Sequence, residues 1–297
     1  IQPVFATTKA VVYAALKTGL DNEIPNTSGY FRPLTITAPE GTIAYPRLPA
    51  PVAARALGNL RIANAVFGAF AQMLPDVVYA ACAGSELGVG MGGYDKSKTP
   101  WKPWVLLEFH NEPGRGGMAA RDGHDGVSAG ITNQANVPAE TIEAEHPVKV
   151  LEYNFVADTE GAGLHRGSMG MVRAYEYTMN ETVLQVRSDR QKYAPYGLHG
   201  GESSCTGSIT VTQDGKTQTM PSKFLMDVGT GDSIRVIWPG GGGWGDPKTR
   251  DPQMVLQDVI EEKVTPERAT NVYCVALTEN NTGIDWKETK KLRNGKR

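Results

Sequence analysis

The stretch VKVLEYNFVADTEGAGLHRGSMGMVRAYEYTMNETVLQVR, residues 148–187, decides the fold class. It contains three runs in which β-branched and aromatic residues alternate with polar ones, a pattern typical of half-buried strands. Further along the chain, the turn dipeptide Asp214-Gly215 separates two more runs and predicts a hairpin. We therefore predict strands at 148–156, 171–178, 182–187, 206–212, 217–220 and 233–238.

Helical patterns flank this region on both sides. Apolar residues recur at helical spacing in Thr8–Leu20 and in Ile62–Met73, where Pro75 is expected to end the helix. Asp251-Pro252 and Thr265-Pro266 each combine a capping residue with proline in the first turn, which favours helix starts. Between the first two helices, residues 32–37 alternate weakly like a strand.

These patterns together predict an α+β fold. We expect a helix-flanked N-terminal segment, a mostly antiparallel, β-rich middle and C-terminal part, and short C-terminal helices. The corresponding division of the chain is 1–147 for a part with helices and glycine loops, 148–250 for the β-rich part, and 251–297 for the C-terminal helices and a basic tail.

Composition excludes several classes of protein. The chain has 34 glycines and 19 prolines, which favour short strands and many turns, while 40% hydrophobic residues argue against disorder. A net charge of −2 gives no field that would attract nucleic acid, and no apolar run approaches membrane-spanning length. Three widely spaced cysteines argue against a disulfide framework and favour a cytoplasmic location.

Two glycine runs could be mistaken for nucleotide-binding loops. Gly88–Gly93 satisfies G-x-G-x-x-G, but the proline-containing segment that follows cannot form the helix that a dinucleotide site requires. Pro239–Pro247, with four consecutive glycines, lacks the Lys-Ser/Thr of a phosphate-binding loop. We expect Gly241 and Gly242 to be structural, in a crossover between a strand and the last helices, and any ATP to bind another polypeptide.

The densest polar stretch, residues 108–126, contains the candidate catalytic groups. Its carboxylates and imidazoles suit general acid–base chemistry or metal binding, and its glycines would let the backbone approach a substrate. The same composition suits an exposed turn in which carboxylates cap backbone N–H groups. We predict catalytic roles for Glu108, Asp122 and His124, with His110, Glu112 and Asp125 as further candidate ligands and Gly116, Gly117, Arg121 and Asn133 as substrate-loop candidates.

Other polar groups favour structural interpretations. Asp189 and Arg190 follow a strand, and we expect an ion pair between them that fixes the loop. For His146 and His165 we expect hydrogen bonds at the surface. Ser203-Ser204-Cys205 has no evident partner base, so the sequence does not favour a serine or cysteine hydrolase.

Six phrases, taken in order, resemble the hydantoinase B (oxoprolinase B) family over about residues 7–273. They are RPLTITAPEGTIAYPRLPAPVAA, LLEFHNEPGRGGMAARDGHDG, ITNQANVPAETIEAEHPVKV, DTEGAGLHRGSMGMVR, LQVRSDRQKYAPYGLHGGE and PGGGGWGDP. The family contains ATP-dependent hydantoinases, 5-oxoprolinases and caprolactamases, and subunits of acetone and acetophenone carboxylases are related to it. Its members are typically longer, and this chain resembles their C-terminal half.

The resemblance implies partners and cofactors. A hydantoinase A-type subunit would bind ATP with Mg²⁺, and the N-terminal half of the B-type subunit would hold any Zn²⁺ or Mn²⁺, so we assign no metal ligand to this chain. The substrate would be a small carbonyl compound, and the assembly a cytoplasmic hetero-oligomer without nucleic acid or membrane.

The reaction stays open at this point. The resemblance favours opening of a cyclic amide such as a hydantoin, oxoproline or lactam. Where many amide-hydrolysing members read H-M-T-N-T-R, this chain has GITNQA at 130–135, which leaves room for an ATP-dependent ketone carboxylase. A third hypothesis is a non-catalytic assembly subunit of such a complex.

Overall fold

The computed structural model describes residues 2–18, 23–74, 76–84, 88–108, 113–128 and 130–295. The α+β prediction is confirmed: within this part of the chain, seven α-helices accompany two antiparallel sheets. The helices are α1 Phe5–Thr18, α2 Ser28–Phe31, α3 Ala56–Met73, α4 Ala139–Glu145, α5 Pro252–Ile260, α6 Pro266–Asn271 and α7 Trp286–Gly295, with a 3₁₀ turn at Pro247–Thr249. The strands are β1 Gly88–Asp95, β2 Lys102–Glu108, β3 Val148–Val156, β4 Gly170–Tyr177, β5 Thr182–Arg187, β6 Ser208–Gln213, β7 Lys216–Thr219, β8 Lys223–Val228 and β9 Ser233–Trp238.

The strands form a two-layered sandwich. One sheet has the order β2-β1-β5-β8 and the other β3-β4-β9-β6-β7, and every pairing is antiparallel. A single hydrophobic cluster joins them: Met91 and Leu184 from the first sheet pack with Tyr175, Ile234 and their neighbours from the second. β1 lies before residue 147 and β5 after it, and the two strands pair in one sheet. The predicted parts 1–147 and 148–250 therefore share a sheet, and the division of the chain at 147 and 250 stays a prediction.

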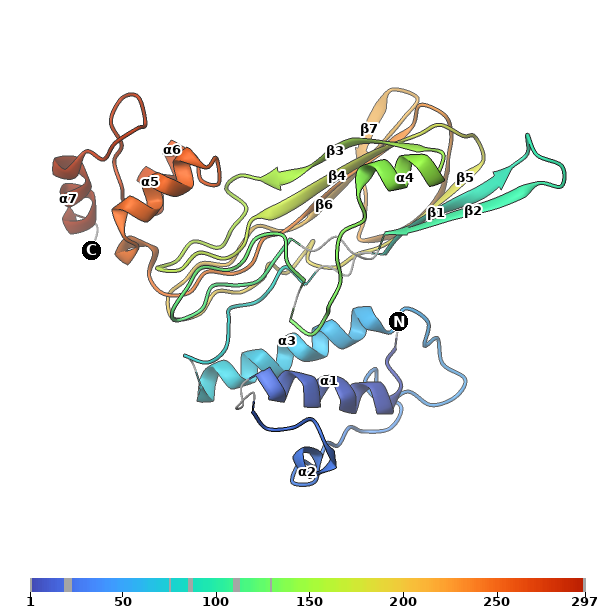
Figure 1. Cartoon of the computed structure of the whole chain (residues 1–297), viewed down its shortest axis with the longest axis horizontal. Helices are drawn as coiled ribbons and strands as arrows, with labels where there is room; N and C mark the ends of the chain where they lie inside the picture. The colour runs from blue at the N-terminus through green and yellow to red at the C-terminus, as the bar shows by residue number, and fades with distance from the viewer. Residues whose placement is uncertain are drawn as a thin grey trace.

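The N-terminal helices form a separate layer beside the sandwich (Figure 1). α1 packs along α3, and a second hydrophobic cluster that includes Val11, Phe67 and Tyr79 fills the space between them. Tyr196 connects this layer to the rest of the chain, since its hydroxyl donates to the Asn64 carbonyl of α3 at 3.0 Å.

Long extended segments run between the sandwich and the C-terminal helices (Figure 1). Their centre is Gly240–Gly243, in which the four residues are buried. A Cβ on Gly241 would overlap the Arg115 carbonyl, and one on Gly242 would overlap the Tyr196 carbonyl. The run is therefore glycine because neighbouring backbones approach from several sides at van der Waals distance.

The C-terminal helices begin where the capping residues predict. The Asp251 side chain accepts from Gln253 N at 2.9 Å, and the Thr265 hydroxyl accepts from Arg268 N at 3.2 Å. A third hydrophobic cluster, with Val255 and Tyr273, lies beneath these helices. No helix in the described residues is long and apolar enough to cross a membrane.

Several predictions of local structure were wrong. Residues 32–37 form a turn and irregular backbone, in which Pro33 cannot donate a ladder hydrogen bond. The glycine run at 88–93, for which we expected a tight loop, belongs to strand β1, where the glycines carry no side chains to show the alternation of a strand. Within the part predicted to hold C-terminal helices and a basic tail, helix α7 includes basic residues, and its Arg293 donates to the Arg250 carbonyl at 2.6 Å. The predicted ends of the first two helices, residues 19–20 and Pro75, lie outside the described residues.

Candidate functional site

A cavity of about 270 Å³ brings together four of the predicted site residues. Gly116, Arg121, Asp122 and His124 all line it. The remaining lining comes from the end of α1, from the segment after α3 and from the same loop: Thr18, Val77, Val78, Tyr79, Arg115, Met118 and Gly130.

The loop that carries these residues folds back on itself. Isolated β-bridges join Gly114 to Asp125 and Met118 to Arg121, and Arg115 N donates to His124 O at 3.2 Å. This narrow excursion presents its tip, around Arg121, to the cavity. The glycines of the sequence predicted such a loop, but not the internal pairing that gives it a fixed shape.

Gly116 and Gly117 meet backbone rather than open space. A Cβ on Gly116 would overlap the Ala80 carbonyl oxygen, and one on Gly117 would overlap the His165 carbonyl oxygen. Gly117 also donates to Gly242 O and accepts from Ala80 N, each at 2.9 Å. Of the two, only Gly116 lines the cavity, so a substrate-loop role for Gly117 stays a prediction.

Asp122 is held by a paired guanidinium. Its two carboxylate oxygens accept from Arg250 Nη1 and Nη2, both at 2.7 Å, and Oδ1 also accepts from Arg166 N at 3.0 Å. Burial alone would raise the pKa of Asp122, but the hydrogen bonds and charge of Arg250, with the charge of Arg166, outweigh it and lower the pKa. Asp122 therefore stays ionised near neutral pH, which suits a positioning role better than proton transfer.

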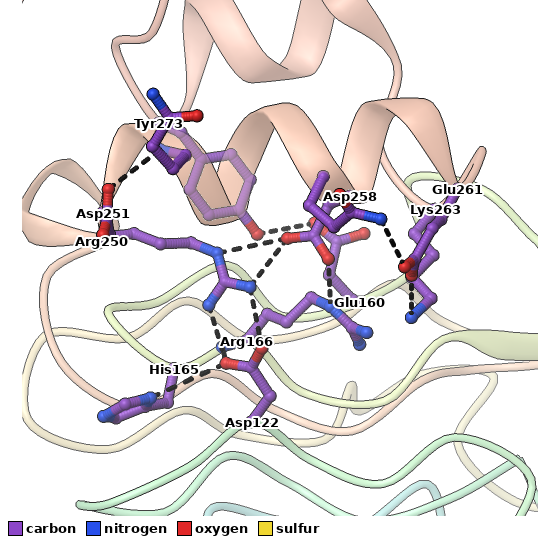
Figure 2. A network of polar contacts seen from close by, with 12 residues as sticks. Asp122, Glu160, His165, Arg166, Arg250, Asp251, Asp258, Glu261, Lys263 and Tyr273 are labelled. Carbon is purple, nitrogen blue, oxygen red and sulfur yellow. Dashed lines mark hydrogen bonds and ion pairs between the residues drawn. The ribbon is translucent and has the colours of Figure 1, made fainter.

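The Asp122–Arg250 pair begins a buried chain of alternating charges (Figure 2). Arg250 continues to Asp258 Oδ2 at 2.7 Å, and Asp258 Oδ1 accepts from Arg166 Nε at 3.1 Å. Arg166 then binds both oxygens of Asp125, at 3.1 and 3.0 Å. The chain ties the cavity loop to helix α5, and each charge has a partner of opposite sign.

A histidine, His165, lies next to this chain of charges. His165 Nδ1 lies 3.7 Å from Asp122 Oδ1 and makes no hydrogen bond with the described residues. His146 is also half-buried, with its Nδ1 unbonded and its ring near Trp104. The hydrogen bonds expected for these residues therefore do not form at Nδ1, where each ring lies beside a tryptophan, Trp104 for His146 and Trp244 for His165.

The cavity offers mainly hydrogen-bond donors. The Tyr79 hydroxyl is buried without a partner among the described residues, and burial raises its pKa, so it remains protonated. Arg115 is anchored through Nε to Ser128 O at 3.0 Å, and Arg121 is exposed with Nε 3.5 Å from Met118 Sδ. Because Arg250 neutralises Asp122, the lining carries a net positive charge. It suits an electron-rich oxygen, such as a carbonyl or an oxyanion.

Glu108 lies elsewhere, inside the sandwich. Only 3% of it is exposed, and its carboxylate accepts from Arg173 and from the Tyr175 hydroxyl, the latter at 2.7 Å. Burial, with the charge of Glu108, raises the pKa of Tyr175. Glu108 does not line the cavity with Asp122, and its catalytic role stays a prediction.

The other predicted residues have separate positions. His124 is exposed at the cavity rim, and Asn133 is exposed on a loop outside the cavity lining. His110 and Glu112 lie outside the described residues. Within the described part of the chain, no group of three or more His, Cys, Asp or Glu could hold a metal ion.

Asp189 has a different partner from the one expected. Its Oδ2 lies 2.9 Å from Arg61 Nε of helix α3, while Arg190 donates to the carbonyls of Ala194 and Cys82, each at 3.4 Å. The predicted Asp189–Arg190 pair was wrong because Asp189 faces α3 across the layer boundary. The pKa of Asp189 is raised, because the effect of burial is larger than the opposing effect of the Arg61 charge.

The sequence model of the hydantoinase B/oxoprolinase family matches residues 1–247, and the chain belongs to that family. It is 37% identical to an uncharacterized protein of Methanocaldococcus jannaschii over 99% of this chain and 51% of that protein. It is 31% identical to the B-type subunit of a putative D-/L-hydantoinase from Pseudomonas sp. strain NS671, over 98% of this chain and 49% of the relative. The chain thus spans about half the length of these relatives.

Two solved structures share the fold. The nucleotide-free structure of acetone carboxylase matches 99% of this chain and 44% of its own, with a TM-score of 0.85 and 16% identity. The ATP-dependent caprolactamase of Pseudomonas jessenii matches 96% of this chain and 50% of its own, with a TM-score of 0.82 and 24% identity.

The buried arginines of the site were not found from the sequence. Arg166 and Arg250 bind Asp122 across 44 and 128 residues of chain, and Asp258 lies 92 residues from Arg166. No local spacing signals such contacts. In the sequence, each arginine lies within three residues of a glycine or proline, where a charged residue is ordinary.

Proposed function

We propose that this chain is the part of an ATP-dependent hydantoinase/oxoprolinase-family complex that receives the carbonyl group of a cyclic amide during ring opening. The observation that carries the proposal is the donor-lined cavity, whose lining includes Arg115, Arg121 and Tyr79, the last with a buried hydroxyl that has no partner among the described residues. Family membership and the relative named as a hydantoinase component support the amide substrate.

The nucleotide is assigned to a partner on physical grounds. A phosphate bound by a glycine loop needs free backbone N–H groups. In Gly241–Gly243 these groups already donate to carbonyls of Ser168, Ala81 and Glu202 at 2.8–3.0 Å. We therefore propose that ATP with Mg²⁺ binds a hydantoinase A-type subunit, and that any Zn²⁺ or Mn²⁺ is held by the N-terminal half of the family's B-type subunit.

Each cavity residue then has a role. Tyr79, Arg115 and Arg121 donate to the substrate oxygen, where negative charge develops when the amide carbon is attacked. His124, at the rim, is placed to exchange a proton with the ring nitrogen, the ordinary task of an imidazole near neutral pH. Asp122 is a positioning residue that fixes the loop through Arg250.

The test is substrate-stimulated ATP hydrolysis by the assembled complex. A panel of hydantoin, 5-oxoproline and caprolactam is compared with a ketone plus bicarbonate. Tyr79→Phe should lower amide-stimulated turnover about 10²-fold, the usual cost of one oxyanion donor. Tyr193→Phe, at an exposed tyrosine, is the matched control and should change nothing. Equal turnover of the two variants would refute the site.

A ketone carboxylase is the second candidate, favoured by the fold shared with acetone carboxylase and by GITNQA at 130–135. ATP hydrolysis that requires ketone and bicarbonate, with no response to cyclic amides, would select it. If turnover stays intact in an assembled complex whose cavity has been disrupted, the chain acts as an assembly subunit.

A further inference from the structure

The four-stranded sheet leaves one face uncovered. Strand alternation directs Val105 and Leu107 of β2, Val183 of β5 and Leu225 of β8 away from the sandwich core, and each is 43–65% exposed. Between them, Gly90 and Gly92 of β1 pair with Leu107 and Val105, and the half-buried Gln185 of β5 lies between Gly90 and Leu225. The glycines leave this apolar surface flat at its centre. We call the four apolar residues and the two glycines the outer face.

The opposite side of the sandwich is built differently. The five-stranded sheet carries two ion pairs between exposed side chains of neighbouring strands: Lys149 with Glu176 at 3.0 Å, and Glu152 with Arg235 at 2.7 Å. Charged pairs of this kind suit a sheet surface that remains in water, whereas a contiguous exposed apolar patch marks an interaction site. The two outer sides of one sandwich therefore have different environments.

We propose that the outer face packs against the polypeptide that makes up the remaining half of the length of the family's B-type subunit. The chain spans 51% and 49% of the two relatives described above, so a segment of nearly equal size lies outside this fold in those proteins. A flat, glycine-centred sheet face accepts a second layer of secondary structure closely, as two-layered domains require. The proposal concerns this surface and is independent of the cavity chemistry.

The experiment uses the complete B-type subunit, supplied as this chain and the remaining half co-expressed as separate polypeptides. Association is measured in the intact complex, as the amount of this chain retained when the remaining half is purified through an affinity tag. Leu225→Glu and Leu107→Glu each bury a charge in the proposed interface and should weaken association more than tenfold. Hydrogen exchange at Val183–Val186 should slow on association.

Leu151→Glu is the matched control, because Leu151 is an exposed leucine of similar accessibility (55%) on β3 of the other sheet. Thermal unfolding of each variant verifies that the sandwich is intact. The proposal is overturned if Leu151→Glu weakens association as much as Leu225→Glu does. It is equally overturned if the outer-face variants leave association unchanged, or if they abolish self-association of this chain instead, which would identify a second copy as the occupant.

Discussion

Replacing Asp122 by asparagine tests whether the charge chain holds the cavity loop. Arg250, only 1% exposed, would lose the anion that contacts both of its terminal nitrogens at 2.7 Å. The asparagine side chain turns its NH2 group toward one of the two Arg250 nitrogens. Asp258 is then the carboxylate left to Arg250, while Arg166 keeps its bonds to Asp125. Breaking a buried ion pair costs about 3–5 kcal/mol.

The lower end of that range applies, because Asp122 keeps 22% of its side chain exposed. About 3 kcal/mol corresponds to a fall in Tm of about 5 °C for a chain of 297 residues. Scanning calorimetry or circular dichroism of the purified protein measures it. Asp189→Asn is the control, since Asp189 pairs with Arg61 but burial raises its pKa. It should cost less than about 1 kcal/mol.

The pH dependence of stability tests the role of Asp122 in a second, independent way. The pKa of Asp122 is lower in the folded state, so its stabilising contribution is fully present above the unfolded value of about 3.9 and is lost as pH falls through the folded value. The stability difference between wild type and Asp122→Asn should therefore be constant near neutral pH and vanish in acid. The raised pKa of Asp189 predicts the opposite trend for its variant. A difference of under about 1 kcal/mol for Asp122→Asn at neutral pH would refute the anchoring role, because a buried pair should cost more.

The packing makes three further predictions. Gly242→Ala should abolish soluble folding, because a Cβ overlaps the Tyr196 carbonyl, whereas Gly295→Ala, with open space around it, should leave soluble yield unchanged; equal yields would contradict the close backbone packing. Glu108→Gln should lower the free energy of unfolding by about 3–5 kcal/mol, because it leaves the buried Arg173 without a counter-charge. Glu152→Gln, in an exposed ion pair, should lower it by less than about 1 kcal/mol, and similar losses for the two variants would contradict a buried Glu108–Arg173 pair. Tyr79→Phe should leave Tm unchanged or raise it slightly, because its hydroxyl has no partner among the described residues, and a marked fall in Tm would show that the hydroxyl is bonded after all.

The strands were predictable where side chains alternate. The predicted ranges 148–156, 182–187 and 233–238 coincide with β3, β5 and β9. β5 and β9 each place a regular apolar set on the sandwich core, and β3 contributes Val148 and Val150. The hairpin turn was predictable from Asp214-Gly215, whose φ values of 50° and 71° are those that this dipeptide tolerates. Helix starts were predictable from capping residues at Asp251 and Thr265.

The failures share a physical cause. Strand β1 contains four glycines, which carry no side chain to show a period, and it forms only because β2 and β5 supply partners on both sides. The partner of Asp189 is Arg61 on α3, which lies far away in the sequence. Local patterns describe what a segment prefers, whereas these features depend on which distant segment lies beside it.

The candidate site contains both a part that local sequence predicted and a part that it did not. Its loop was identified from glycines interspersed with ionisable residues, and the cavity does collect Gly116, Arg121, Asp122 and His124. The two supports of that loop differ in kind: closely packed backbone fixes Gly116 and Gly117 on one side, and the Asp122–Arg250 pair fixes the other. A loop held at both sides keeps its donors in place, so that substrate-binding energy is not consumed in ordering them. Such preorganisation requires residues far from the loop, such as Arg250. Mutations that break the Asp122–Arg250 pair should therefore lower stability, whereas mutation of Tyr79 should lower turnover.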